Sequence, residues 1–520
     1  MEKNIQLIIP MSGIGKRFID AGYEQPKPLL EVDGSPIIKH VVDMFPGVEN
    51  VTFIVNESHI STTKVIETLK LIKPNCKIYT VPNENRKGPV DAVKQIFEHI
   101  DDDAETIVSY CDYGTAWNFD KFLETARTQN WDGGIPCYTG FHPHMLGSDN
   151  YAFCKEENNI LIKIKEKEPF TNNKMEEFAS NGTYYFKTGY LVKKYFKELI
   201  DLDLNLKGEF YVSLVYNLLV RDGLKIGIFE IEKMLQWGTP YDLEIYKGWS
   251  NYFNNIQKTL TSADHKDTTL LLPMAGKGSR FSDQGYEQPK PLINVNGKPM
   301  IIQAVDCLPT TSNKIFICAE EQINKYNVDQ ILINHFPNTS VVSVKKTTQG
   351  QACTCELGLI QSNFDLNKPI LISACDNGVL YNAENYQKLI DDDSIDVIVW
   401  TFRNNQTSKV KPNMYSWVDV DTHNKVQFVS CKKFVHEDPL KTHAIIGTFF
   451  YKKAKDFLDG LKANYKENIR TGGEFYVDDV VNQNVKGGLN VVVFEVDNYI
   501  CWGTPDDYKT YNYWREYFLK

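Results

Sequence analysis

The chain has 520 residues, more than one ordinary hydrophobic core holds, so two or more domains are expected. Hydrophobic residues make up 42% and charged residues 24% of it, which is typical of globular proteins and excludes disordered and collagen-like chains. The formal net charge is −10 and no long run of Lys or Arg occurs, which argues against nucleic acids and anionic membranes as partners.

Cellular location and cysteine chemistry can also be predicted. The N-terminal apolar run is too short for a signal peptide, and no stretch approaches the ~20 apolar residues of a membrane span, so we expect a cytoplasmic protein. The 11 cysteines are odd in number and scattered, and no set of Cys and His residues has the spacing of a zinc site. Reduced thiols are therefore expected.

In chain order, the first expected elements are a strand at 5–11, a glycine-containing loop, a helix within 35–45 and a strand at 51–56. The same series returns at 268–274, 298–308 and 314–319. Strands that alternate with helices indicate βαβ units, and hence an α/β fold with a largely parallel central sheet flanked by helices. Ligands of such sheets bind beyond the carboxyl ends of the strands, where both glycine loops fall.

The chain repeats itself in sequence as well as in pattern. The string GYEQPKPL occurs twice, at 22–29 and 285–292. Further segments match at a nearly constant offset, namely 10–38 with 273–301, 108–114 with 372–378, 208–217 with 473–482 and 237–243 with 502–508. Such a register predicts a duplicated domain. We expect domains at 1–253 and 268–520, joined by the polar linker 254–267.

The loop after the first strand reads GIGKR, and its counterpart in the second copy reads GKGSR. Glycines let backbone N–H groups approach a phosphate, while Arg and Lys add positive charge. Prolines flank the lysine of GYEQPKPL, so a stiff segment holds this cation in place. The motif is neither a P-loop nor a dinucleotide fingerprint. The candidate phosphate-binding residues are Gly13, Gly15, Arg17 and Lys27, with Gly276, Gly278, Arg280 and Lys290 in the second copy.

The motif G-x-G-x-R followed by P-K-P-L, present twice, resembles that of the NDP-sugar pyrophosphorylases, a family of sugar-phosphate nucleotidyltransferases. The resemblance covers nearly the whole chain as two tandem copies. It implies two Rossmann-like domains in which the glycine loop and Arg17 hold a triphosphate and Lys27 reaches the reacting phosphates. Arg280 and Lys290 take the same roles in the second copy.

The resemblance also implies contacts to the nucleotide base. The segment NRKGPVDAV, at 85–93, is similar to the family's base-contacting loop, in which Gly88 lets the base approach. In the second copy, TTQGQACT supplies Gln349 and Gly350 for the same purpose.

A catalytic Mg²⁺, for which Mn²⁺ could substitute, is implied at the ends of two apolar strands, on Asp112 and Asp376. The second metal carboxylate of the family is missing, since Gln236 and Cys501 stand at its place. Two alternatives stay open: another acid serves, or one Asp holds the ion. The candidate second ligands are Asp242 and Asp507.

Acceptor contacts are expected in the second half of each copy. The segment KEKEPF resembles the family's acidic-Lys-Pro segment, which makes Lys167 and its counterpart Lys432 candidates for binding the acceptor's phosphate. Cys431 replaces Glu166 beside this lysine, so the two acceptors are expected to differ. Two glutamates in GEFYV are candidates for acceptor hydroxyls, with a surface glutamate as the competing interpretation; they are Glu209 and Glu474.

The loop at 140–151 carries two histidines that the second copy lacks. Because they neighbour each other near a proline in a polar loop, we interpret His144 as an acceptor contact rather than a metal ligand.

The residues and the resemblance together predict a tandem, bifunctional nucleotidyltransferase. It would transfer NMP from an NTP to a sugar phosphate or similar ester and release pyrophosphate, making activated precursors for surface polysaccharide. The alternatives are a CTP-dependent enzyme acting on a phosphoalcohol such as phosphocholine, a related GT-A-type glycosyltransferase, and a non-catalytic role for one copy. The motifs CDYG and CDNG lack the D-x-D of such glycosyltransferases. A homo-oligomer is left open.

Overall fold

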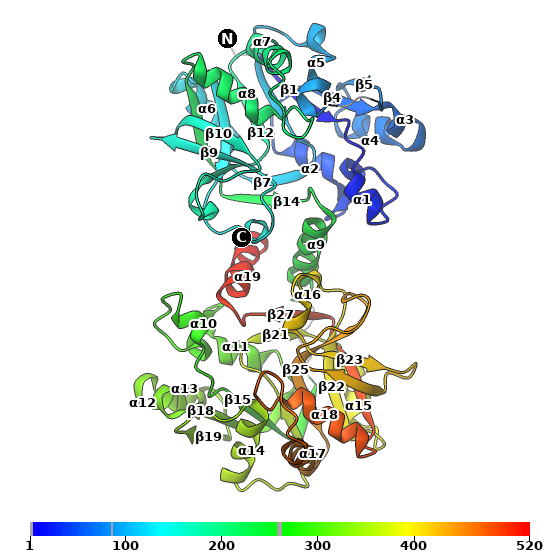
Figure 1. Cartoon of the computed structure of the whole chain (residues 1–520), viewed down its shortest axis with the longest axis vertical. Coiled ribbons are helices and arrows are strands. Elements are labelled where there is room, and N and C mark those ends of the chain that lie inside the picture. The colour runs from blue at the N-terminus through cyan, green and yellow to red at the C-terminus, as the bar shows by residue number, and fades with distance from the viewer. Residues whose placement is uncertain (1–3, 85–86, 257–262) are drawn as a thin grey trace. The chain divides into compact units, whose positions relative to one another are not determined.

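The computed structural model describes residues 4–84, 87–256 and 263–520. The chain divides into two compact units, Met1–Ser250 and Asn251–Lys520, each a sheet with helices packed against it (Figure 1). Within the expected linker, residues 257–262 lie outside the described part of the chain. Its other residues close helix α9 (Pro240–Asn255) and open strand β15 (Asp264–Pro273).

The sheet of the first unit joins its described strands in the order β11-β9-β10-β13-β8-β12-β6-β1-β4-β5. Their bounds are β1 Ile5–Met11, β4 Asn50–Asn56, β5 Lys77–Val81, β6 Glu105–Ser109, β8 Gly133–Tyr138, β9 Ala152–Glu157, β10 Ile160–Glu166, β11 Phe178–Ser180, β12 Thr183–Phe186 and β13 Ile226–Glu230. Helices α5 (Pro89–Lys94), α7 (Gly189–Asp201) and α8 (Val212–Arg221) bury apolar residues against this sheet in one hydrophobic cluster. Burial of these side chains holds the unit together.

The second unit has a sheet of the same strand order along β19-β18-β15-β20-β25-β22-β26. The bounds of the strands other than β15 are β18 Thr310–Ala319, β19 Thr339–Val344, β20 Ile370–Ile372, β22 Val397–Phe402, β25 His443–Tyr451 and β26 Val491–Glu495. Helices α14 (Gln351–Gln361), α17 (Ala454–Glu467) and α18 (Val477–Lys486) pack against it. The two sheets therefore match in order, and each strand of one has a counterpart in the other along this path.

The expectation of a largely parallel sheet is correct for the early strands of each unit and for the pairs β8–β13 and β22–β26, but strands between them run antiparallel. In the first unit, β1 runs parallel to β4 and β6, whereas β12 is antiparallel to β6 and β8. The sequence interpretation extended the βαβ pattern of the first strands to the whole sheet, but later strands return through short turns. Asn158 and Asn159 join β9 to β10 with φ angles of 53° and 60°, which suit a two-residue hairpin turn. The fold is a mixed α/β fold.

In both units, an asparagine side chain on a helix hydrogen-bonds both the N–H and the C=O of one strand residue; we call this pair of hydrogen bonds a bracket. Asn217 on α8 accepts a hydrogen bond from the backbone N–H of Ile164 at 3.0 Å and donates one to its carbonyl at 2.9 Å. Asn482 on α18 brackets Val429 on strand β24 (Val426–Ser430) identically, at 2.8 Å each way. The bracket fixes the end of that strand, where Lys167 and Lys432 follow.

In the described parts of the chain, none of the helices combines the length and hydrophobicity that a bilayer crossing requires.

We expect residues 1–250 and 251–520 to fold when expressed separately. The cluster containing Ile8 draws its described residues from the first unit, and the clusters containing Leu270 and Ile317 draw theirs from the second. The cut is placed before Asn251 because the Phe253 ring packs on Tyr511 at 6.0 Å between centroids. Far- and near-UV circular dichroism should show cooperative thermal unfolding of both fragments; a fragment without a near-UV signal would contradict the expectation.

Candidate active site

The glycine loops that follow β1 and β15 turn through left-handed glycines. Gly15 has φ 68° and begins helix α1 (Lys16–Asp20), and Gly278 has φ 61° and begins α10 (Ser279–Ser282). A Cβ atom on Gly15 would lie 3.6 Å from the Cβ of Lys27, and one on Gly278 would lie 3.1 Å from that of Lys290. The left-handed backbone favours glycine at both positions, and at Gly278 the closeness of Lys290 favours it as well. The first glycines of the loops, Gly13 and Gly276, have open space around them.

The predicted catalytic lysine and the predicted metal ligand form an ion pair in each unit. Lys27 Nζ lies 2.6 Å from Asp112 Oδ2, and their side chains are 21% and 24% exposed. Burial alone would lower the pKa of Lys27, but the charges of Asp112 and Cys111 and the hydrogen bond to Asp112 raise it overall. Lys290 pairs with Asp376 in the same way, and its pKa is raised by the same balance of effects. The ammonium groups are fully charged at neutral pH.

Local structure explains how these side chains meet. Lys27 opens the short 3₁₀ turn η1 (Lys27–Leu29), which Pro28 and Leu29 anchor by being buried. Asp112 lies in the turn between β6 and strand β7 (Tyr113–Ala116). The turn and the strand end thus bring together residues 85 positions apart in the chain. The predicted phosphate ligands Arg17 and Arg280 are exposed on α1 and α10, and the charge of Arg17 acts on Lys27 and Asp242.

The WGTP segment forms the other wall of this site. Strand β14 (Lys233–Gln236) pairs with β7, and a Cβ on Gly238 would lie 3.1 Å from Asp112 Oδ2. In the second unit, strands β21 (Asn377–Leu380) and β27 (Asn498–Cys501) pair likewise, and a Cβ on Gly503 would lie 3.0 Å from Asp376 Oδ2. The repeated WGTP was visible in the sequence, but only the structure shows that its glycine makes room for the carboxylate.

The candidate second metal ligands lie at helix starts beside this carboxylate. Thr239 Oγ1 donates a hydrogen bond to Asp242 Oδ2 at 2.6 Å. Burial, partly offset by Thr239 and Arg17 and aided by the charge of Asp112, raises the pKa of Asp242 to about 6. Asp507, at the start of α19 (Pro505–Phe518), is bound by Thr504 at 2.7 Å and by the Cys501 thiol at 3.5 Å.

Among the described residues, no group of three or more His, Cys, Asp and Glu side chains is arranged to hold a metal ion. In the first unit the charge of Asp112 acts on Asp242, and in the second unit Cys501 lies within electrostatic reach of both Asp376 and Asp507. Mg²⁺ is commonly bound by one or two carboxylates together with substrate phosphates, so this donor set fits that ion.

The predicted base-contacting glycines are required by the protein's own backbone. Gly88 has φ 94°, and a Cβ there would lie 2.9 Å from the backbone N and O of Phe210. Phe210 N–H donates a hydrogen bond to Lys87 O at 2.7 Å, which connects the GEFY segment to this loop. Gly350 has φ 133°, and a Cβ there would lie 2.5 Å from the backbone N and O of Phe475. The loop's first residues, 85 and 86, lie outside the described part of the chain.

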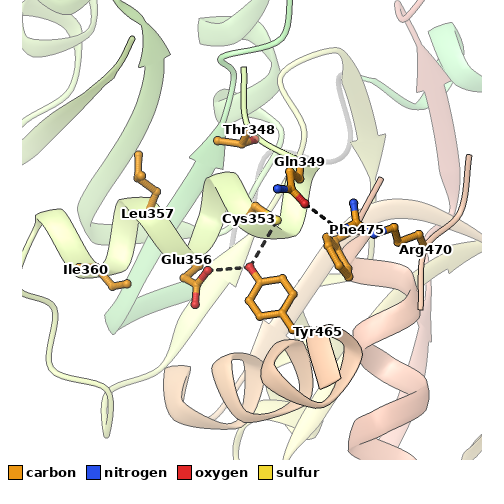
Figure 2. A pocket seen from close by; sticks show the side chains of 9 residues that line it. All are labelled: Thr348, Gln349, Cys353, Glu356, Leu357, Ile360, Tyr465, Arg470 and Phe475. Atoms are coloured by element: carbon orange, nitrogen blue, oxygen red, sulfur yellow. Dashed lines mark hydrogen bonds between the residues drawn. The ribbon is translucent and has the colours of Figure 1, made fainter. Parts of the chain in front are cut away.

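Gln349 points toward Arg470 across a groove on the surface of the second unit (Figure 2). Arg470 Nη2 donates to Gln349 Oε1 at 2.8 Å, and the guanidinium lies 4.1 Å from the centre of the Phe475 ring. The groove has a volume of about 490 Å³. Its lining residues are Thr348, Gln349, Cys353, Glu356, Leu357, Ile360, Tyr465, Arg470 and Phe475. A nucleotide contact by Gln349 stays a prediction.

The candidate acceptor lysines share an unusual backbone. Lys167 and Lys432 both have left-handed conformations, with φ 58° and 53°. Lys167 Nζ donates to the Tyr211 hydroxyl at 2.5 Å, and that hydroxyl in turn donates to Glu209. In the second unit the corresponding Tyr476 ring lies 5.6 Å from Lys432 Nζ.

These lysines also lie near the rest of each site. The charge of Lys432 contributes to the low pKa of Asp376: burial would raise that pKa, but Lys290 above all, and then Lys432, lower it overall. Tyr211 and Tyr476 were not predicted as functional residues, although the repeated GEFYV contains both. The exposed carboxylates of Glu209 and Glu474 accept hydrogen bonds from these tyrosines.

The histidine loop is packed, contrary to the polar loop suggested by the sequence. His144 Nε2 lies 3.0 Å from the Tyr138 hydroxyl, and its ring centre is 4.9 Å from that of Tyr151. Burial lowers the pKa of His142 to about 3 and also that of His144, so both rings are neutral. Tyr151 hydrogen-bonds Gln236 and lies within electrostatic reach of Asp112. His144 thus lies behind Tyr151, which borders the site.

Comparison with known proteins gives matches to about half of the chain. The family model for nucleotidyl transferases matches residues 7–210. The bifunctional protein GlmU of Legionella pneumophila is 24% identical over 221 residues, which are 42% of this chain and 46% of that protein, so the chain spans about half the length of this curated relative.

Solved structures are also similar. The nucleoside-diphosphate-sugar pyrophosphorylase of Vibrio cholerae RC9 shares 20% identity with a TM-score of 0.39, covering 46% of this chain and 98% of that chain. The inositol-1-phosphate CTP transferase of T. maritima shares 16% identity with a TM-score of 0.38, covering 48% and 97%. The residues matched by the family model for nucleotidyl transferases include the glycine loop, Lys27, Asp112 and Lys167.

Proposed function

We propose that the protein is a tandem nucleotidyltransferase in which each unit transfers NMP from an NTP to the phosphate of a small ester, releasing pyrophosphate. The observation that carries this proposal is the lysine–aspartate pair beside a glycine loop, repeated in both units as Lys27–Asp112 and Lys290–Asp376. The family match of residues 7–210 supports it for the first unit. We take the acceptor to be a sugar phosphate and the product to be an activated precursor for polysaccharide.

The chemistry requires positioning and charge neutralisation rather than a protein nucleophile. An acceptor phosphate is already ionised at neutral pH, so its oxygen can attack the α-phosphorus of the NTP in line, and pyrophosphate leaves. The glycine loop and Arg17 would hold the triphosphate, and the Lys27 ammonium would neutralise negative charge at the reacting phosphates. Lys167, held by Tyr211 at 2.5 Å, would bind the acceptor's phosphate.

Asp112 and Asp242 would hold Mg²⁺ together with phosphate oxygens. The ion would supply a positive charge that polarises the phosphates. Asp112 is paired with Lys27, so each of these charges has a partner within the protein itself. Asp376 and Asp507 would play the same part in the second unit.

The acceptor class separates the main alternatives. A screen of the four NTPs with sugar 1-phosphates and with phosphoalcohols such as phosphocholine, read out by pyrophosphate release, distinguishes a sugar-phosphate enzyme from a cytidylyltransferase. Release with an acceptor of neither class would contradict both, and transfer of a sugar from an NDP-sugar without pyrophosphate release would indicate a glycosyltransferase.

Turnover should depend on both aspartates and on Mg²⁺. Asp112→Asn and Asp376→Asn each remove the charge that an ion needs, so each should lower its own unit's pyrophosphate release by about 100-fold or more. The double variant should lose activity with every substrate pair. Full activity in the double variant, or activity unchanged by EDTA, would contradict the metal assignment.

Lys27→Met should lower both turnover and stability. The loss of the ammonium removes an interaction with the reacting phosphates, so kcat should fall about 100-fold. It also leaves the three-quarters buried Asp112 without its partner, at a cost of about 1–3 kcal/mol. Adding Asp112→Asn to Lys27→Met should restore most of the lost melting temperature, measured by differential scanning calorimetry, but not the turnover. A double-mutant cycle of the two substitutions tests this expectation. Lys290→Met with Asp376→Asn is the matched control in the second unit.

The first unit should lose its affinity for Mg²⁺ below about pH 6. The pKa of Asp242 is raised to about 6, so its carboxyl gains a proton as the pH falls through that value and no longer ligates a cation well. The Mg²⁺ concentration for half-maximal activity, measured from pH 5 to 8 in the Asp376→Asn background, should rise as the pH falls. Asp242→Asn should remove this dependence; an unaltered pH profile would exclude Asp242 as a ligand.

A further inference from the structure

The asparagine brackets show which residues correspond around the proposed acceptor lysines. The second residue after the bracketed strand residue is Glu166 in the first unit and Cys431 in the second. The helix residue four positions before the bracketing asparagine is Ser213 in the first unit and Asp478 in the second. A carboxyl group is therefore absent from the strand of the second unit and present on its helix.

A third position, on the neighbouring strand, differs as well. In the first unit, Ala152 at the start of β9 pairs with Glu166. In the second unit, Ser416 directly precedes β23 (Trp417–Val420) and continues its register to lie opposite Cys431, with the hydroxyl 3.6 Å from the thiol. The second unit thus has a hydroxyl group where the first has a methyl group.

In the first unit the carboxyl comes from the strand and the hydroxyl from the helix. Ser213 Oγ donates a hydrogen bond to Glu166 Oε2 at 2.6 Å. Burial raises the pKa of Glu166, and the hydrogen bond from Ser213 and the charge of Lys167 partly offset this rise. The pair of groups therefore lies within electrostatic reach of the proposed acceptor lysine.

In the second unit the same two groups have changed places. The Ser416 hydroxyl hydrogen-bonds the Asp478 carboxyl, and its oxygen accepts a hydrogen bond from the Lys432 N–H at 3.3 Å. Burial raises the pKa of Asp478, and Ser416 and the charge of Lys432 partly offset this rise. The carboxyl comes from the helix and the hydroxyl from the strand side, beside the corresponding lysine.

Packing alone does not account for this exchange. Apolar residues at these positions would fill the space without the cost of removing a carboxyl group from water. Both units nevertheless keep a carboxyl, a hydroxyl and a lysine together, although the residues at the three surrounding positions differ. A chemical requirement for a carboxyl beside the acceptor lysine explains why it is retained on a different element.

The retained carboxyl has an oxygen available for a further hydrogen bond. Glu166 Oε2 accepts from Ser213, and in the part of the chain that the structure describes no donor bonds Glu166 Oε1. A carboxylate only accepts hydrogen bonds, so the missing partner is a donor. A hydroxyl group suits this place better than an ammonium group, which the neighbouring Lys167 would repel.

We infer that Asp478 supplies to the second site, from α18, the carboxyl that Glu166 supplies to the first from β10, and that each accepts a hydrogen bond from a hydroxyl group of the acceptor. This inference rests on the proposed function. It makes the acceptors of both units hydroxyl-bearing phosphate esters, such as sugar phosphates, although the residue before each lysine differs.

Binding of two phosphate esters to the full chain tests this inference. Glucose 1-phosphate carries hydroxyl groups and methyl phosphate carries none, so the second ester reports on the phosphate contact alone. Lys432→Met leaves the first site as the reporter, and Lys167→Met leaves the second. Isothermal titration calorimetry measures glucose 1-phosphate directly and methyl phosphate by its displacement of glucose 1-phosphate.

Removal of each carboxyl's charge should affect the two esters differently. Glu166→Gln in the first reporter and Asp478→Asn in the second should each lower the affinity for glucose 1-phosphate about tenfold, because an amide oxygen accepts a hydrogen bond more weakly than a carboxylate. The affinity for methyl phosphate should change by less than about threefold. A structural role of the carboxyl would lower both affinities alike.

Transfer of the first unit's residues into the second separates the carboxyl from its position. In the Lys167→Met background, Asp478→Ser alone should lower the affinity for glucose 1-phosphate about tenfold. Adding Cys431→Glu and Ser416→Ala should restore it to within about threefold of the background protein. A folded triple variant that does not recover affinity would contradict the equivalence of Asp478 and Glu166. The two charge substitutions decide the matter even where the triple variant fails to fold.

Equal losses of affinity for the two esters, or no binding of glucose 1-phosphate at either site, would overturn the inference. So would a greater loss for phosphoethanolamine than for glucose 1-phosphate, because the carboxyl would then bind a cation. The proposed function fails by a different result, which is binding of glucose 1-phosphate without pyrophosphate release when each of the four NTPs and Mg²⁺ is added.

Discussion

Each proposed site depends on one ion pair between a loop lysine and a strand-end aspartate. Lys27 and Asp112 are three-quarters buried, and a charge in that environment is costly unless it is paired. The pairing constrains three segments at once: the glycine loop, whose Gly15 packs on the lysine; the turn after β6; and the WGTP segment, whose Gly238 leaves room for the carboxylate. The proposed chemistry with phosphates uses both charges, and their pairing makes both compatible with the fold.

The sequence could predict the members of this arrangement but not their contact. Lys27 and Asp112 were identified separately, from a proline-flanked cation and from an acid after an apolar strand. Their pairing depends on how far the turn at Lys27 reaches across the sheet, which no local pattern encodes. Strand and helix periodicity predicted the parallel part of each sheet, where βαβ units set the direction. It failed for the later strands, because antiparallel direction arises from turns such as Asn158–Asn159.

The packing of the structure explains why certain residues occupy their positions, which the sequence patterns could not explain. Gly88 was predicted to admit a base. The position requires glycine, however, because a Cβ there would lie 2.9 Å from the backbone N and O of Phe210. His144 was predicted as a contact in a polar loop, and it lies in an aromatic cluster behind Tyr151. Tyr211 gave no signal of its own, since a tyrosine before a helix is common. In each case the deciding neighbour is more than six residues away in the chain, where periodicity and local motifs carry no information.

The two units can be compared at the position where the family resemblance implies a metal-binding acid. Gln236 hydrogen-bonds Tyr151 in the first unit, and Cys501 hydrogen-bonds Asp507 in the second. Burial raises the pKa of the Cys501 thiol, so it remains protonated and neutral, and a neutral thiol is a poor ligand for a hard cation. Both units therefore place a neutral hydrogen-bonding group at this position, and the neighbouring helix-start acid, Asp242 or Asp507, is the second carboxylate of the proposed site. Because an acid at a helix start is already oriented by its threonine, at 2.6 Å from Thr239 and 2.7 Å from Thr504, the proposed ligand set would take this acid from a different element without a change in its charge.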